Sequence, residues 1–174
     1  MKAVASVLLL TLIMSGCSTR KATLKNHKVT LQPYTKPPKN ETPPYRLHNK
    51  NIITLALYDE YLKWHGVLYK FGGSSKNGID CSALVQNLYQ DAFGIKIPRT
   101  TKEQIRYGQF IGKNRLREGD IIFFKTGWSS MHSGIYLERG NFIHASTKHG
   151  VTISNVNNPY WKSKYLKSKR LLNY

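Results

Sequence analysis

One cysteine and two histidines are the side chains of this sequence that could support nucleophilic catalysis. Cys81 lies in the segment IDCSALVQ, and His132 and His144 lie in the segment MHSGIYLERGNFIHAS. A thiolate attacks carbonyl carbons, and an imidazole that accepts the thiol proton activates it. A second imidazole can orient the first. This chemistry requires the three side chains to meet in space, so the elements that carry them must be considered next.

Cys81 is predicted to lie in the first turn of a helix that runs from Cys81 to Phe93. Asp80 is a suitable N-cap, and Gly94 ends the segment. Apolar residues follow Cys81 at helical spacing, so the thiol lies on the stripe that faces the core. The positive end of the helix dipole favours the thiolate form at this position. Taken alone, a cysteine on an apolar helical face is more often a small core residue.

The two histidines are predicted on neighbouring strands, at residues 132–137 and 141–146. A two-residue turn would place the imidazoles on opposite faces of the sheet. A three-residue turn that ends at Gly140 in the left-handed conformation pairs Gly134 with His144 and puts both histidines on one face. Such diagonal neighbours lie about 7–8 Å apart at the backbone. We predict the three-residue turn, in which Gly134 leaves room for a ring.

The segment from residue 51 to Gly66 is predicted to form the first helix. Its apolar side chains recur at helical spacing: Ile53, Leu57, Tyr61 and Trp64. The glycine-rich stretch 72–78 is predicted to be a loop that leads into the helix of Cys81. Thr100 and Glu103 have the spacing of a capping box, which predicts a short third helix up to Tyr107.

The second half of the domain is predicted to form a sheet. Short β-rich runs separated by turn residues follow Gly119: 120–125, 132–137, 141–146 and 150–154. Helices followed by strands, without alternation of the two, predict an α+β fold with an antiparallel sheet. The residues after 159 carry five positive side chains and no acidic one, and no element is predicted there.

The composition fits one globular domain of ordinary size. The chain has 174 residues, of which 40% are hydrophobic and 11% aromatic. This length can bury a normal core without disulfides or a structural metal, and the composition excludes collagen-like, coiled-coil and wholly disordered proteins. The net charge of +18 predicts anionic surroundings. No nucleic-acid motif is present, and much of the charge lies near the two ends, so we expect no nucleic-acid partner.

Residues 1–16 have the composition of an export signal. Lys2 is followed by the apolar run 7–14 and by two small residues that precede Cys17. The run is too short to span a bilayer as a helix. The segment resembles a bacterial lipoprotein signal, in which Cys17 becomes the lipidated first residue and Ser18 matches outer-membrane sorting. An ordinary signal peptide with an incidental cysteine is the alternative.

Residues 17–50 are predicted to be a disordered tether, and residues 51–174 the folded domain. The stretch from 18 to 50 contains eight Lys and Arg residues, one acidic residue and five prolines, without apolar periodicity. If Cys17 carries lipid, Cys81 is the only thiol of an exported domain. An unpaired cysteine in an oxidising compartment is either buried and inert or chemically employed.

A zinc site formed by Cys81, His132 and His144 is a weaker alternative. Structural and catalytic zinc sites usually contain a close ligand pair such as HxxxH or CxxC, and the chain has neither motif. We therefore expect no metal and no cofactor.

The ordered motifs FGGSSKNGIDCSALVQ, REGDIIFF, HSGIY and FIHAS resemble the NlpC family of bacterial cell-wall cysteine peptidases. The resemblance covers about residues 51–174 and implies a papain-like fold. It implies that Cys81 is the nucleophile, His132 the base and His144 the polar third member. Ser133 departs from the family pattern, which usually has valine there, and we interpret it as a sign of a wetter face of the sheet.

The resemblance also implies roles for residues around the thiol. Tyr69 matches the family tyrosine whose hydroxyl lies near the oxyanion site, and packing against Phe71 is the alternative interpretation. Asp80 and Ser82 match positions that line the substrate cleft, although Asp80 could be a helix cap alone.

The family hydrolyses amide bonds in the peptide stems of peptidoglycan. The resemblance therefore implies a murein endopeptidase that forms a thioester at Cys81. From the lipoprotein-like signal we expect lipid on Cys17 to hold the protein at the outer membrane, facing the periplasm, and we expect a monomer. The target could be the D-Glu–diaminopimelate link within a stem or the D-Ala–diaminopimelate cross-link. The alternatives are a non-catalytic protein that binds the wall, and amidase or acyltransferase chemistry on the same scaffold.

Overall fold

A computed structural model describes residues 49–174, and the side chains from Ile52 onward. The predicted signal peptide (1–16), Cys17 and nearly all of the predicted tether (17–50) lie outside the described residues. The helices are α1 (Asn49–Trp64), α2 (Cys81–Phe93), α3 (Thr101–Gln104) and α4 (Pro159–Lys164), with a 3-10 turn at Lys113–Arg115. The strands are β1 (Ser74–Ser75), β2 (Gly78–Ile79), β3 (Gln109–Ile111), β4 (Ile121–Lys125), β5 (Met131–Tyr136), β6 (Asn141–Ser146), β7 (Gly150–Asn155) and β8 (Tyr165–Arg170).

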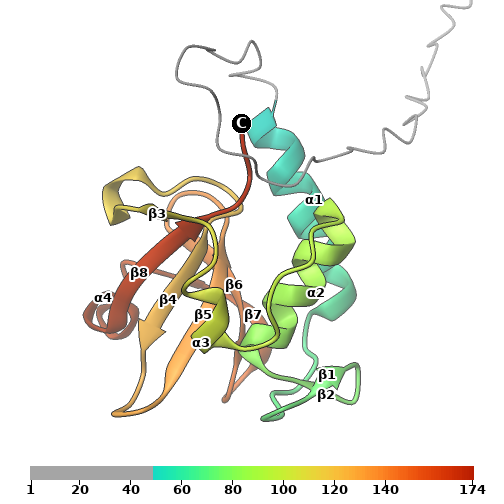
Figure 1. Cartoon of the computed structure of the whole chain (residues 1–174). Coiled ribbons are helices and arrows are strands. Elements are labelled where there is room, and N and C mark those ends of the chain that lie inside the picture. Colours follow the sequence, from blue (N-terminus) through green and yellow to red (C-terminus); the bar gives the residue numbers. More distant parts are fainter. Residues whose placement is uncertain (1–48) are drawn as a thin grey trace, which may run out of the picture.

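Six strands form one antiparallel sheet in the order β3-β8-β4-β5-β6-β7. The helices α1 and α2 pack together and cover one face of this sheet (Figure 1). Residues of α4 pack on the opposite face, where Trp161 contacts the rings of Phe124 and Phe142. The predicted α+β class with an antiparallel sheet is confirmed.

The central strand β4 is buried on both faces. Side chains alternate along a strand, so Ile121 and Phe123 point toward the helices while Ile122 and Phe124 join the smaller cluster on the other face. This double burial explains why the segment is a continuous apolar run. The predicted strand is confirmed at residues 121–125.

The helix of Cys81 begins and ends where its capping residues predict. The Ala83 N–H donates to Asp80 Oδ1 at 2.7 Å, and Gly94 has a φ of 69° and donates its N–H to the Gln90 carbonyl. Leu84 and Leu88 are fully buried against the sheet. The helix therefore holds its first turn at one end of the domain, as Figure 1 shows.

The first helix, α1, begins at Asn49, two residues before the predicted start. Its predicted apolar stripe, which includes Leu57 and Trp64, is buried against the core. None of the helices within residues 49–174 is long and apolar enough to cross a membrane.

The third helix, α3, is shorter than predicted. Its capping box between Thr100 and Glu103 forms as expected, but the helix ends at Gln104 instead of Tyr107. The next backbone bonds close tighter turns, since the Tyr107 N–H donates to the Gln104 carbonyl three residues earlier. Gly108, with a φ of 82°, then redirects the chain into β3.

Several elements were not predicted. The stretch 72–78 contains the two short paired strands β1 and β2 instead of a loop alone. The lysine-rich segment of β8 is a strand because it lies between β3 and β4, where its Ser168 is fully buried. The helix α4 starts with Pro159 and is capped by the Asn158 side chain, a start signal that the sequence does contain.

Candidate active site

The thiol of Cys81 lies in the first turn of α2 and is buried. Cys81 is a free cysteine, and its Sγ lies 3.7 Å from Oγ1 of Thr101, the first residue of α3. Within the described residues, no hydrogen bond joins this thiol to an imidazole. Because catalytic hydrogen bonds are often long before substrate binds, this resting arrangement is compatible with a nucleophile.

The strands that carry the histidines adopt the predicted register. Ile135 pairs with Ile143, and the Leu137 N–H donates to the Asn141 carbonyl at 2.8 Å. Gly140 ends the turn with a φ of 86°. The predicted three-residue turn is therefore confirmed, and both histidine side chains project from one face of the sheet.

The two imidazoles are in direct contact. His132 Nε2 lies 3.0 Å from His144 Nδ1. A Cβ added to Gly134 would lie 2.6 Å from the Ile143 carbonyl oxygen and 3.2 Å from the His144 Cβ, so a larger residue would push the strand bearing His144 away. Glycine is therefore required at position 134 by the close approach of the β6 backbone and the Phe142 ring, and its role in leaving room for the imidazole stays a prediction.

The contact continues into β7, which sequence reasoning missed. His144 Nε2 lies 2.9 Å from the Ser154 hydroxyl oxygen. Ser154, His144 and His132 thus form a row, and the Nδ1 atom of His132 has no hydrogen-bond partner within residues 49–174. This free nitrogen is the atom that can exchange a proton with a nucleophile. The alternation of β7 could have placed Ser154 on the histidine face only after the pairing of β6 with β7 was known.

Trp161 of α4 packs against both imidazoles and was not assigned a role from the sequence. Its ring centroid lies 5.4 Å from that of His132, in a stacked arrangement, and 4.9 Å from that of His144. Burial lowers the pKa of His132 to about 4. It lowers the pKa of His144 as well, with a further contribution from the charge of His132. Both rings are therefore neutral near pH 7, and a neutral imidazole can accept a proton.

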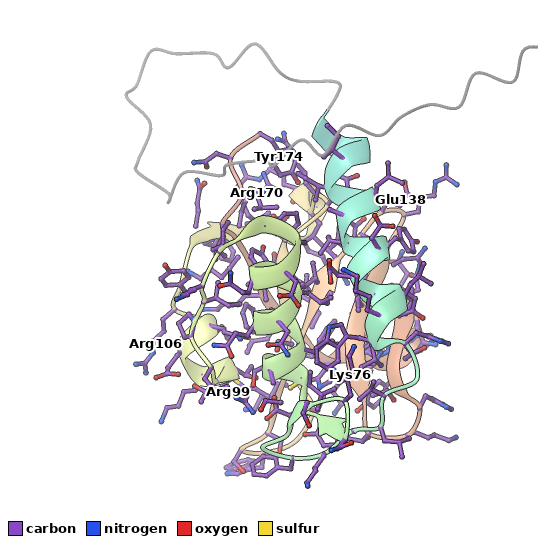
Figure 2. All side chains as sticks on the ribbon, turned by 90° about the vertical axis from the view of Figure 1, so that its right-hand side faces the viewer. Lys76, Arg99, Arg106, Glu138, Arg170 and Tyr174 are labelled. Carbon is purple, nitrogen blue, oxygen red and sulfur yellow. The ribbon has the colours of Figure 1, made fainter. Side chains whose placement is uncertain are left out.

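Asp80 and Ser82 lie on either side of Cys81 and share one partner, Arg99, which sequence reasoning missed. Two guanidinium nitrogens of Arg99 donate to the two carboxylate oxygens of Asp80 at 3.0 and 2.8 Å, and one also donates to Ser82 Oγ at 3.1 Å. Figure 2 shows Arg99 near the lower end of the domain, where α2 begins. This network holds the segment before the thiol in a fixed position.

The carboxylate of Asp80 is ionised. Burial opposes its ionisation, but the hydrogen bonds from Arg99, the Ala83 N–H and Ser82 outweigh burial and lower the pKa of Asp80. The role of Asp80 as a helix cap is confirmed. Asp80 and Ser82 are both buried, and their role in lining a substrate cleft stays a prediction.

Tyr69 lies close enough to the thiol to be affected by its charge. Burial raises the pKa of Tyr69, and the charges of Cys81 and Asp80 raise it further. Tyr69 packs against the main core, whereas Phe71 is 89% exposed. Tyr69 therefore packs on the core and not on Phe71, and its role near an oxyanion stays a prediction.

Ser133 is fully buried, so the interpretation of a wetter sheet face at this position is wrong. Its side chain points away from His132, toward α3, where its hydroxyl donates to Gln104 Oε1 at 3.4 Å. The polar side chain is tolerated in the core because it has this buried polar partner. Gln104 was also missed, because nothing in the sequence indicates what its side chain contacts.

The weaker zinc alternative receives no support. Across residues 49–174, no group of three or more histidine, cysteine, aspartate and glutamate side chains could hold a metal ion. The described residues provide a free thiol at a helix start, next to the charged network of Asp80 and Arg99, and a neutral histidine pair packed against Trp161. Their residue types are suited to acyl transfer, and contact between the thiol and His132 stays a prediction.

Comparisons with known proteins agree with this description. The model of the NlpC/P60 family matches residues 66–170, more than half of the chain. The chain is 38% identical over 168 residues to murein DD-endopeptidase MepS/murein LD-carboxypeptidase of Escherichia coli, covering 92% of this chain and 87% of that protein. It is 36% identical to the probable endopeptidase NlpC of the same organism, with 95% and 97% of the two chains covered.

The fold is similar to solved structures of the same family. An NlpC/P60 family protein from Bacillus cereus superposes with a TM-score of 0.62 at 32% identity. The match covers 69% of this chain and 40% of that protein, so the chain spans less than half the length of that solved relative.

Proposed function

The chain belongs to the NlpC/P60 family, and on that premise we propose that it is a peptidoglycan endopeptidase that cuts amide bonds in murein peptides. The observation that carries this proposal is the row of contacts Ser154–His144–His132, in which the Nδ1 atom of His132 has no partner among the described residues. The same domain places Cys81 at the start of a helix. A nucleophile, a base and an orienting group are the parts that covalent acyl transfer needs.

The hydrogen-bond row assigns a tautomer to each ring. If His132 Nδ1 accepts the thiol proton, the resting proton of this ring lies on Nε2 and is donated to His144 Nδ1. His144 then carries its own proton on Nε2 and donates it to the Ser154 hydroxyl. His144 and Ser154 therefore hold His132 in the orientation and tautomer in which it acts as a base.

The reaction proceeds in two halves. Cys81 Sγ transfers its proton to His132 Nδ1 and attacks the carbonyl carbon of the peptide, whose oxygen becomes an oxyanion. The C–N bond then breaks, the leaving amine takes the proton from His132, and a thioester remains on Cys81. Water, deprotonated by His132, attacks the thioester and releases the carboxylate product and the thiol.

Two groups are available to stabilise the oxyanion. Backbone N–H groups in the first turn of α2 have no carbonyl partner within the helix and point toward its N-terminal end. The hydroxyl of Tyr69 is the second proposed donor, supported by the influence of the Cys81 charge on its pKa.

The proposed substrate is the D-Ala–diaminopimelate cross-link of murein. The family hydrolyses links within stems as well as cross-links, and the name DD-endopeptidase of the MepS relative favours the cross-link. The net charge of +18 suits a polymer whose stems carry carboxylates. We also propose that lipid on Cys17 holds the monomeric protein at the outer membrane, facing the periplasm, with residues 17–50 as its tether.

Digestion of purified sacculi tests the proposed activity. The purified chain is incubated with sacculi, and the released muropeptides are identified by mass spectrometry, which also reports the bond that is cut. The Cys81→Ala variant should reduce release by at least about 10⁴-fold, because no other nucleophile replaces the thiol. Equal release by the Cys81→Ala variant would exclude the cysteine peptidase mechanism. Binding of the unchanged protein to sacculi without any release would instead indicate a non-catalytic wall protein.

The proposed anchor has its own test. The Cys17→Ala variant should move the protein from the membrane fraction to the soluble periplasmic fraction, and mass spectrometry of the mature N-terminus should show lipid on Cys17 only in the unchanged chain. A cleavage site at another residue, without lipid, would indicate an ordinary signal peptide.

A further inference from the structure

The side-chain amide of Gln104 is fully buried and makes hydrogen bonds to three separate segments. Its Nε2 donates to the Ser82 carbonyl and to the Pro98 carbonyl, each at 2.9 Å. Its Oε1 accepts from the Ser133 hydroxyl at 3.4 Å. A buried amide with all of its groups engaged fixes the relative position of the segments that it joins.

Two of the three segments carry the proposed catalytic groups. Ser82 directly follows Cys81 in α2, and Ser133 directly follows His132 in β5. Figure 1 shows α3 beside β5 and near the start of α2, and α3 contacts both elements. Gln104 joins the first turn of α2 directly to β5, through the Ser82 carbonyl on one side and the Ser133 hydroxyl on the other.

Because side chains alternate along a strand, the hydrogen bond at Ser133 also affects the position of the His132 imidazole. Successive side chains of a strand point to opposite faces, so Ser133 points toward α3 while His132 points toward Trp161. A shift or rotation of β5 at Ser133 therefore also moves the His132 ring. On the other side of the link, a shift of the Ser82 carbonyl moves the first turn of α2 and with it the thiol.

The position of Gln104 is itself well determined. The capping box of Thr100 and Glu103 starts α3, and the hydroxyl of Thr101 contacts the thiol at 3.7 Å. Gln104 thus belongs to a rigid turn that already touches the nucleophile.

We propose that Gln104 is a positioning residue that sets the distance between the Cys81 thiol and the His132 imidazole, with Ser133 as the second half of the link. This inference rests on the proposed function, because it assigns Gln104 to the same reaction. A merely structural role would lower stability alone, whereas a positioning role changes the reactivity of the thiol and the turnover rate.

The test compares Gln104→Met, Ser133→Ala and the double variant with the unchanged chain. Methionine has a similar length and cannot form the three hydrogen bonds. Gln86→Met is the matched control, because Gln86 also donates from its Nε2 to a loop carbonyl, that of Ile97 at 2.7 Å, and among the described residues this bond does not reach β5. Three quantities are measured for each variant: the pH profile of Cys81 alkylation by iodoacetamide, kcat and KM for murein fragments, and the urea midpoint of unfolding.

Gln104→Met should lower kcat by about 10- to 100-fold with little change in KM and should shift the alkylation profile, since a displacement of about 1 Å costs about that much. Ser133→Ala should lower kcat by about fivefold, the value of one hydrogen bond. The double variant should be no worse than Gln104→Met, because both changes break the same link. Gln86→Met should retain the kcat and alkylation profile of the unchanged chain.

Several results would overturn the inference. A folded Gln104→Met variant with an unchanged profile and kcat would do so, as would a Gln86→Met variant with the same losses. If Gln104→Met does not fold, the Ser133→Ala variant tests the inference instead. An unchanged kcat and alkylation profile in that variant would then overturn it. Failure of the unchanged chain to cut murein would count against the proposed function, whereas alkylation still tests the positioning role without a substrate.

Discussion

The domain contains two aspartate–arginine pairs at opposite ends, and they differ in how deeply they are buried. Asp80 pairs with Arg99 beside Cys81, and the Asp80 side chain is 10% exposed. Asp120 pairs with Arg170 at the other end of the sheet, where the carboxylate has no exposed surface. Figure 2 shows Arg99 at the lower end and Arg170 with Tyr174 at the upper end. We call these the reactive end and the locked end.

The pKa values of the two carboxyl groups shift in opposite directions, although the paired arginine lowers both. At the locked end, burial raises the pKa of Asp120 despite two hydrogen bonds of 2.7 Å from Arg170. At the reactive end, the hydrogen bonds to Asp80 outweigh burial, and its pKa is lowered. The hydrogen bonds from Arg99, the Ala83 N–H and Ser82 therefore favour the charged form of Asp80 more than burial opposes it, whereas the deeper burial of Asp120 outweighs its hydrogen bonds to Arg170.

The locked end ties distant segments together. The Tyr89 hydroxyl of α2 donates to the Gly119 carbonyl, and the Tyr174 hydroxyl donates to the Glu118 carbonyl. Arg170 at the end of β8 reaches Asp120 just before β4. Long-range polar contacts therefore gather at this end, whereas the residues proposed for the chemistry lie toward the other.

The largest expected effect comes from the histidines of the reactive end. His132→Ala should lower kcat by about 10³-fold, because the proton acceptor is lost, and His144→Ala by about 10²-fold or less, because it only orients His132. Release of muropeptides at saturating sacculi measures both rates, and circular dichroism verifies folding. Equal losses from the two variants would contradict this division of roles.

The next largest effect is a difference between the two ends in how much a lost charge lowers the free energy of unfolding. Asp120→Asn should lower the free energy of unfolding by about 3 kcal/mol, because Arg170 is left without its buried counter-charge. Asp80→Asn should cost about 1 kcal/mol, because asparagine also caps helices and Arg99 can reach water. Urea titration measures both values. The comparison fails if Asp80→Asn is the more destabilising change.

Acid should also weaken the fold through the histidine pair. The pKa of His132 is lowered from 6.5 to about 4 by burial, so the unfolded chain binds more protons between these pH values. Stability from this group is complete above pH 6.5 and is lost on acidification, by up to about 3 kcal/mol near pH 4. Urea midpoints measured across this range should fall with pH in the unchanged chain.

A control variant identifies the group responsible. His132→Gln, which cannot be protonated, should show a flatter pH dependence, whereas the exposed His65→Gln should behave as the unchanged chain. An equally steep slope in His132→Gln would assign the acid sensitivity to other groups.

The smallest expected effect is at Trp161. Trp161→Phe should cost about 1 kcal/mol of stability, because this ring is only partly buried. It should also admit water to the imidazoles and raise the pKa of His132 toward its ordinary value, as followed by NMR titration of the ring protons. An unchanged pKa of His132 in this variant would show that groups other than Trp161 exclude water from the imidazoles.

Local signals in the sequence were sufficient for the parts of the site that one short segment forms. The caps of α2, the capping box of α3 and the turn at Gly140 all depend on residues within a few positions of one another. The shared face of His132 and His144 followed from the length of a single turn. These predictions were correct because backbone geometry alone decides them.

The partners of those groups could not be predicted in the same way. Arg99, Gln104, Ser154 and Trp161 come from other elements, and β8 carries a lysine-rich sequence that becomes a strand only between two neighbours. The interpretation of Ser133 was wrong for the same reason, since its burial depends on the position of α3.

The amino-acid sequence by itself determined where the helix of Cys81 starts, which way the histidines face and which family the motifs indicate, because each depends on short-range geometry and residue type. Only the tertiary structure decided which arginine pairs with Asp80 and which amide joins the segment of the thiol to the strand of the histidines. It also decided which aromatic ring covers the two imidazoles. Those contacts join residues far apart in the chain, and their energy appears only when burial removes water from both partners.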